Sequence, residues 1–215
     1  MKLTAAKSTY TSIAAIIVWF ALVLQLKLSI GQFGGDVWSA LKLYLSFFTI
    51  LTNILVACCL TFINFSKGTK MSLFFKKSST QTAINVYILI VGLIYNVSLR
   101  GLTHPVGWYR LADELLHVVN PLLFLGYWMF FVSKEHLQYK DAIKWLVYPF
   151  AYVLFIIVRG YLIRQYPYPF INVVELGYPK ALLNTGVILF IFWLLSLLFV
   201  LIGKKINKSI AHILH

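Results

Sequence analysis

Apolar residues along the chain gather into six runs of roughly twenty residues, and short segments rich in Lys, Gly, Pro and Asp separate the runs. A helix of about 20 apolar residues crosses the hydrocarbon core of a bilayer. Lipid offers backbone groups no water, so helices are the natural spanning form. The pattern therefore predicts an all-α polytopic membrane protein, a single six-helix domain over residues 1–215 with spans near 10–30, 40–63, 82–99, 113–132, 143–161 and 180–202.

Composition supports this fold class. Of the 215 residues, 60% are hydrophobic and 12% are charged, whereas a soluble domain has about 45–50% apolar and about 25% charged residues. The first apolar run is longer than the core of a signal peptide and lacks a small-residue cleavage site. We therefore expect it to be retained as the first span.

The formal net charge of +13 orients the spans rather than indicating a nucleic-acid partner, because no run of Lys or Arg resembles a nucleic-acid arm. Twelve of the 19 basic residues fall on one side of the predicted topology, and all twelve are lysines: Lys2, Lys7, Lys67, Lys70, Lys76, Lys77, Lys134, Lys140, Lys144, Lys204, Lys205 and Lys208. The positive-inside rule places this side, with both termini, in the cytoplasm. Membrane lipids are the expected partners of these lysines.

Polar residues within the second run form a stripe at helical spacing: Lys42, Ser46, Thr49 and Asn53. Steps of four, three and four residues would place them on one face of a continuous helix. Ser and Thr in a span often bond their own preceding carbonyls, and Asn often bonds a neighbouring helix. A site in the bundle interior is the alternative.

The fourth run carries Asp113, His117 and Asn120. Asp113 lies one turn before the histidine and is placed to fix its tautomer. Thr49 lies seven residues beyond Lys42, and His117 lies seven beyond Arg110, which is about 10 Å of helix in both cases. The threonine and the histidine are therefore predicted to share one level of the bundle.

Other polar positions offer support for such a site. In the fifth run, Tyr148, Tyr152 and Arg159 lie on one face, and Arg159 is a candidate to hold a carboxylate. Aromatic belts and outward snorkelling explain these residues equally well. Cys58 and Cys59 are adjacent, and no strict ligand spacing appears, so neither a disulfide framework nor a metal or cofactor site is expected.

Two segments carry a family resemblance: FFTILTN at 47–53 and LLHVVNP at 115–121. Together with WLVYP at 145–149 and YPYPF at 166–170, they resemble the androgen-induced gene family and its bacterial six-span relatives. The similarity covers roughly residues 39–178, and the order and spacing of the motifs carry it.

The resemblance implies an intramembrane threonine hydrolase that cleaves fatty acid esters of hydroxy fatty acids or similar lipid esters. It implies Thr49 as the nucleophile and His117 as the base, and a bacterial plasma membrane as the location. Thr52 is a second threonine within the same motif and stays an alternative nucleophile. Lys42, Asn53 and Asn120 are candidate oxyanion donors among which the sequence does not choose.

Two other functions fit the same residues. A small transporter or channel would line its path with the polar stripe, and a membrane scaffold would use it to bond helices together. The substrate's chain length, the physiological role and the oligomeric state stay open.

Overall fold

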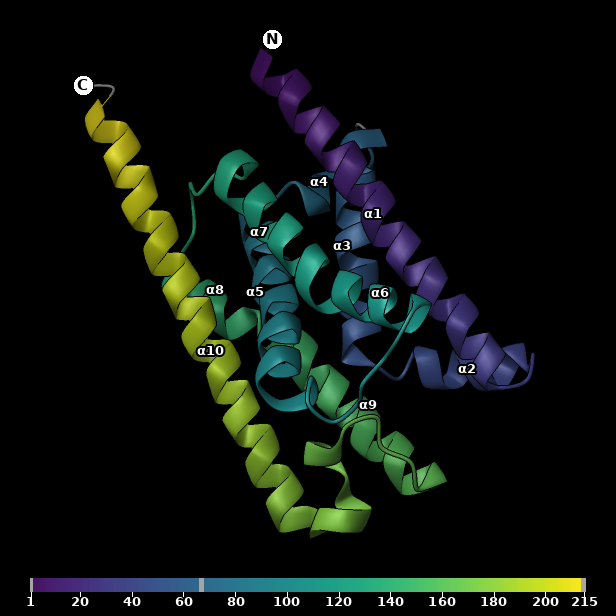
Figure 1. The fold of residues 1–215 in the computed structure, drawn as a ribbon. Coiled ribbons are helices and arrows are strands. Elements are labelled where there is room, and N and C mark those ends of the chain that lie inside the picture. Colours follow the sequence, from purple (N-terminus) through teal and green to yellow (C-terminus); the bar gives the residue numbers. More distant parts are fainter. Residues whose placement is uncertain (1, 66–67, 214–215) are drawn as a thin grey trace. The chain divides into compact units, whose positions relative to one another are not determined.

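The computed structural model describes residues 2–65 and 68–213, with side chains from 4 to 207, and every regular element among them is a helix (Figure 1). Within this described part, six helical segments are long and apolar enough to cross a membrane: Thr4–Gln32, Phe48–Phe65, Ser78–Leu99, Trp108–Phe131, Tyr139–Ile163 and Val173–Asn207. This confirms the all-α fold with six candidate spans and indicates an integral membrane protein. Lys67, on which the predicted orientation partly rests, lies outside the described residues.

The chain divides into two compact units, Met1–Ser133 and Lys134–His215. The first unit contains α1 (Lys2–Gln32), α2 (Val37–Tyr44), α3 (Phe48–Phe65), α4 (Lys70–Phe75), α5 (Ser78–Ile94), α6 (Trp108–Glu114) and α7 (Asn120–Phe131). The second contains α8 (Tyr139–Lys144), α9 (Val147–Ile163) and α10 (Val173–Ile213). That the two units form one domain stays a prediction.

Among the four spans of the first unit, α3 contacts both α1 and α5, and α5 in turn packs on α7. Apolar side chains with almost no exposed surface fill the space between them, such as Val56 and Leu60 of α3, Val86 of α5 and Phe124 of α7. Apolar burial alone does little to hold helices together in lipid, so close packing and interhelical hydrogen bonds have to define their positions.

The second span is not the single helix that the sequence led us to expect. α2 ends at Tyr44 and α3 begins at Phe48, and α2 runs across the end of the first unit instead of continuing the line of α3 (Figure 1). The Ser46 hydroxyl donates to the Leu43 carbonyl at 2.6 Å, and the Ser46 N–H donates to the same oxygen at 2.9 Å. This tight turn replaces the helical register, so the predicted stripe is not one continuous helical face.

Asp36 starts α2 as its N-cap, accepting from the backbone N–H groups of Trp38 and Ser39. The Ser39 hydroxyl also donates to its carboxylate at 2.6 Å, and this hydrogen bond lowers the pKa of Asp36 below its usual value. A capped start and the turn after Tyr44 make α2 a short, separate helix.

Two short π-helical segments interrupt the spans of the first unit: η1 (Tyr95–Leu99), which follows α5, and η2 (Leu115–Val119), between α6 and α7. In each, the backbone N–H bonds five residues back, from Arg100 to Tyr95 and from Asn120 to Leu115. Such segments are rare and frequently occur at functional sites.

The second unit is simpler. α10 packs against α8 and α9, and it bends where Gly177 takes φ 71°, two residues before Pro179. Gly160 of α9 lies directly against the Tyr166 ring, because a Cβ built there would come within 2.1 Å of that ring. The YPYPF segment is thereby packed onto α9.

Candidate active site

The structure brings Thr49 and His117 together. Thr49 lies in the first turn of α3 and is 9% exposed, and its Oγ1 is 3.5 Å from Nε2 of His117. The two residues come from different spans, 68 positions apart in the chain. A distance of 3.5 Å is at the outer limit of a hydrogen bond, and such contacts in catalytic sites often tighten only when substrate binds.

The other ring nitrogen of His117 defines its tautomer. Nδ1 lies 2.9 Å from the backbone oxygen of Asp113 and 3.1 Å from its Oδ1. Both are acceptors, so in the neutral imidazole Nδ1 carries the proton and Nε2 presents its lone pair to Thr49. The predicted role of Asp113 as the partner of His117 therefore has a direct geometric basis.

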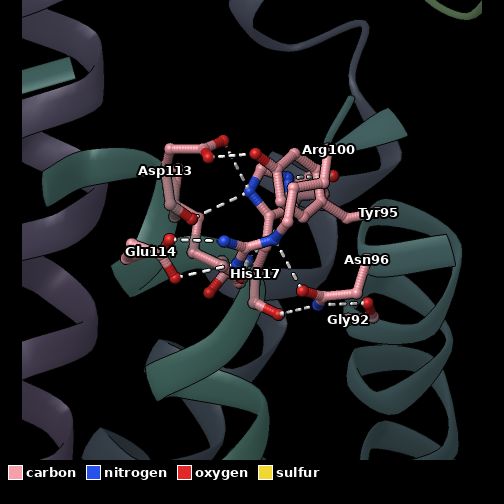
Figure 2. Close-up of polar contacts among 10 residues, drawn as sticks. Gly92, Tyr95, Asn96, Arg100, Asp113, Glu114 and His117 are labelled. Carbon is pink, nitrogen blue, oxygen red and sulfur yellow. Dashed lines mark hydrogen bonds and ion pairs between the residues drawn. The ribbon is translucent and has the colours of Figure 1, made fainter. Parts of the chain in front are cut away.

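Tyr95, the first residue of η1, completes this cluster (Figure 2). Its ring stacks on the His117 imidazole with centroids 3.9 Å apart and planes 13° from parallel. Its hydroxyl donates to Oδ2 of Asp113. Sequence reasoning missed Tyr95, because nothing in the local pattern distinguishes it from the twelve other tyrosines.

The π-helical turn around His117 leaves backbone carbonyls without their usual partners. Pro121 has no N–H to give the His117 carbonyl four residues earlier. The N–H of Asn120 bonds Leu115, so the Leu116 carbonyl also loses its α-helical donor. Such groups need other donors in lipid, and neighbouring spans supply them.

Two asparagines provide these donors. The Asn53 amide donates to Leu116 O at 3.3 Å, and the Asn96 amide donates to His117 O at 3.4 Å. Asn53 also donates to Thr49 O at 2.8 Å, and its own oxygen accepts from Asn120 at 2.8 Å. One side chain thus links α3, which carries Thr49, to the turn that carries His117.

Gly92 permits this arrangement by letting α5 approach η2 closely. A Cβ at this position would lie 3.0 Å from His117 O and 3.4 Å from Pro121. A larger residue would push the two spans apart and take Asn96 away from the His117 carbonyl.

An ion pair connects the two segments at the edge of the site. Both terminal nitrogens of Arg100 donate to the Glu114 carboxylate, at 2.6 and 2.9 Å, and its Nε donates to Asn96 at 2.8 Å (Figure 2). The hydrogen bond to Glu114 raises the pKa of Arg100 above its usual value. The guanidinium of Arg100 is therefore paired with a carboxylate of the same unit, that of Glu114.

Two cavities reach Asp113 beside the loop that precedes α6. One of about 330 Å³ is lined by Tyr95, Arg110 and Asp113, among others. The other, of about 460 Å³, is lined by Gln25, His104 and Asp113, among others. The Asp113–Tyr95 pair therefore lies next to space that a polar group can occupy.

The remaining predicted site residues are Lys42, Ser46, Tyr152 and Arg159. Lys42 is exposed in the last turn of α2, and Ser46 is buried in the turn that follows. Tyr152 and Arg159 belong to α9 of the second unit, where Arg159 donates to the Gln165 carbonyl at 3.0 Å. Among the described residues, no group of three or more His, Cys, Asp or Glu side chains is placed to hold a metal ion.

Comparisons with family models, with curated proteins and with solved structures found no match to this chain.

Proposed function

We propose that this protein is an intramembrane hydrolase of lipid esters, with Thr49 as nucleophile and His117 as general base. The observation that carries the proposal is the line of contacts from Thr49 Oγ1 to His117 Nε2 and from His117 Nδ1 to Asp113. A nucleophile, a base and a group that orients the base are the parts of an acyl-transfer site. The resemblance of the two motifs to a threonine hydrolase family agrees with this assignment.

The chemistry proceeds in two acyl transfers. His117 Nε2 accepts the Thr49 hydroxyl proton as Oγ1 attacks the ester carbonyl carbon. The bond from that carbon to the leaving oxygen then breaks, and His117 gives its proton to this oxygen. Water, deprotonated by the same nitrogen, attacks the acyl-threonine, and its proton returns to Thr49 as the fatty acid leaves.

The surroundings of Thr49 favour a charged transition state. Thr49 is in the first turn of α3, where the helix dipole stabilises developing negative charge. Asn53 and Asn120 use their amide groups to bond Thr49 O, Leu116 O and each other. We therefore assign these asparagines a positioning role and the α3 terminus the stabilisation of the oxyanion.

The substrate proposed is an acyl ester of a lipid, such as a fatty acid ester of a hydroxy fatty acid. Both reacting side chains lie on segments apolar enough to span a membrane, so a lipid tail reaches them without crossing water. We further propose that both termini face the cytoplasm of a bacterial plasma membrane.

The test is ester cleavage by the purified full chain in lipid nanodiscs, with labelling by a fluorophosphonate probe as a second readout. Wild type is expected to cleave the ester and take up the probe, Thr49→Ser to retain part of both, and Thr49→Ala to lose both. Thr52→Ala is the matched control for the neighbouring hydroxyl and is expected to stay active. Labelling that persists in Thr49→Ala and disappears in Thr52→Ala would move the nucleophile to Thr52.

Solute uptake into liposomes by both wild type and Thr49→Ala, without any ester cleavage, would support a transporter instead.

A further inference from the structure

Tyr95 contacts both supporting members of the proposed catalytic set. Its hydroxyl donates to the Asp113 carboxylate, and its ring lies 3.9 Å from the His117 imidazole in a stacked arrangement (Figure 2). A tyrosine at a membrane interface would present its hydroxyl to water and headgroups. Tyr95 is instead 6% exposed and is directed into the cluster.

Resting on the function proposed above, we infer that Tyr95 is a positioning residue for this reaction. It holds the imidazole plane by stacking and the Asp113 carboxylate by hydrogen bonding, so that His117 Nε2 faces Thr49. Asp113 uses Oδ1 for His117 and Oδ2 for Tyr95. The carboxylate is therefore held from two sides, and rotation about its side-chain bonds would break one of these contacts.

The stack also favours the step in which His117 is charged. When Nε2 takes the proton from Thr49, the ring becomes an imidazolium lying against the face of Tyr95. Cations are attracted to the faces of aromatic rings, more strongly where water is excluded. The ring thus interacts better with the charged form that develops during the reaction than with the resting form, which is the requirement for lowering a barrier.

Arg100 supports Tyr95. Its guanidinium carbon lies 5.3 Å from the Tyr95 ring centroid, while its nitrogens bond Glu114 and Asn96. Tyr95 is thus held by η1 and by an ion pair to α6, which carries Asp113. Positioning groups of this kind act through the residues they hold and leave substrate binding largely unchanged.

Two variants separate the roles of the hydroxyl and the ring. Tyr95→Phe keeps the stack and loses the hydrogen bond to Asp113, so kcat is expected to fall about tenfold with KM unchanged. Tyr95→Leu loses both contacts and is expected to lose about a hundredfold in kcat, with slower labelling of Thr49 by the fluorophosphonate probe. A higher kcat for Tyr95→Phe than for Tyr95→Leu would show the contribution of the ring stacking.

Tyr87→Leu is the matched control for general damage to α5. Tyr87 is equally buried on the same helix, two turns before Tyr95, and its loss is expected to change stability more than kcat. A Tyr95→Leu variant that is folded and keeps wild-type kcat would overturn the inference while leaving the hydrolase intact. A decrease in kcat as large for Tyr87→Leu as for Tyr95→Leu would also overturn it. Wild type without cleavage or labelling would instead remove the proposed function, and the role of Tyr95 with it.

Discussion

The two units differ in the hydrogen bonds that several of their buried polar side chains make. In the second unit, the Thr185 and Ser196 hydroxyls donate to carbonyls one turn earlier on their own helix, Ala181 and Phe192. The first unit has such local bonds too, as from Thr11 to Lys7 O, but it also has bonds that cross between helices, as when Asn53 bonds Leu116 and Trp128 bonds Thr82. A hydroxyl bonded within its own helix places no constraint on a neighbour, whereas a cross-helix bond does. The first unit therefore has the contacts needed to hold a site in place.

The π-helical segments are a second difference between the two units. Both η1 and η2 belong to the first unit, and both carry members of the Thr49–His117–Asp113–Tyr95 cluster. In η2 the helical hydrogen bonds that are lost at Leu116 O and His117 O are replaced by Asn53 and Asn96 of other segments. The second unit bends at Gly177 and Pro179 instead.

The largest difference between the units is expected in the rate of ester hydrolysis when one threonine of each unit is replaced by alanine. Thr49→Ala should lower ester hydrolysis at least about 1,000-fold, because it removes the proposed nucleophile. Thr185→Ala should leave hydrolysis within about twofold of wild type, because an exposed or locally bonded hydroxyl is worth little. Initial rates in nanodiscs with equal protein content measure both, and equal rates for the two variants would contradict the assignment.

The free energy of unfolding should depend more on the Asn53 amide, which bonds across helices, than on the Ser196 hydroxyl, which bonds within its own helix. Asn53→Leu should lower the free energy of unfolding by about 1–3 kcal/mol, since Leu116 O and the Asn120 amide lose a partner inside the bundle. Ser196→Ala should change the free energy of unfolding by less than about 0.5 kcal/mol, because its hydroxyl bonds only its own helix. Equilibrium unfolding in mixed detergent micelles gives both values. A neutral Asn53→Leu would show that the amide does not join the helices.

Two glycines should respond to alanine with opposite signs. Gly92→Ala places a Cβ 3.0 Å from His117 O and should destabilise the protein by about 1–3 kcal/mol through overpacking. Gly186 of α10 has nothing within 4 Å of its Cβ position, and Gly186→Ala should stabilise the protein by about 0.5–1 kcal/mol. Thermal unfolding in the same detergent compares them. Stabilisation by both substitutions would mean that α5 and η2 do not approach closely.

The last prediction concerns the pH dependence of stability through Lys134, which lies between the fourth and fifth predicted spans and is 8% exposed. Burial lowers the pKa of Lys134 to about 8, below the ordinary 10.5 that applies to the unfolded chain. Between these values the unfolded chain binds more protons, so the free energy of unfolding should rise as pH increases from about 8 toward 10.5. Unfolding midpoints measured from pH 7 to 10 show how steeply the free energy of unfolding changes with pH. Lys134→Met should flatten this dependence, and an unchanged slope would assign the pH dependence to another group.

Much of the architecture follows from the distribution of apolar residues along the chain. Six runs of spanning length predict six helices, because a backbone in lipid has few other ways to satisfy its hydrogen bonds. The sequence also placed Thr49 and His117 at one level, but that count assumed an unbroken helix from Lys42 to Thr49, whereas α2 ends at Tyr44 and α3 begins at Phe48. Both inferences use only the rise of a helix and the thickness of a bilayer.

Other parts of the site depend on how the helices pack. The turn at Ser46 and the two π-helical segments follow no spacing that a sequence pattern would register, and Gly92 by itself does not show that α5 approaches His117 O. Tyr95 became part of the site only when η1 was placed against η2. A residue's periodicity reports which face of a helix it occupies, but the donors that replace missing backbone bonds come from other helices, and these are known only after the helices have packed.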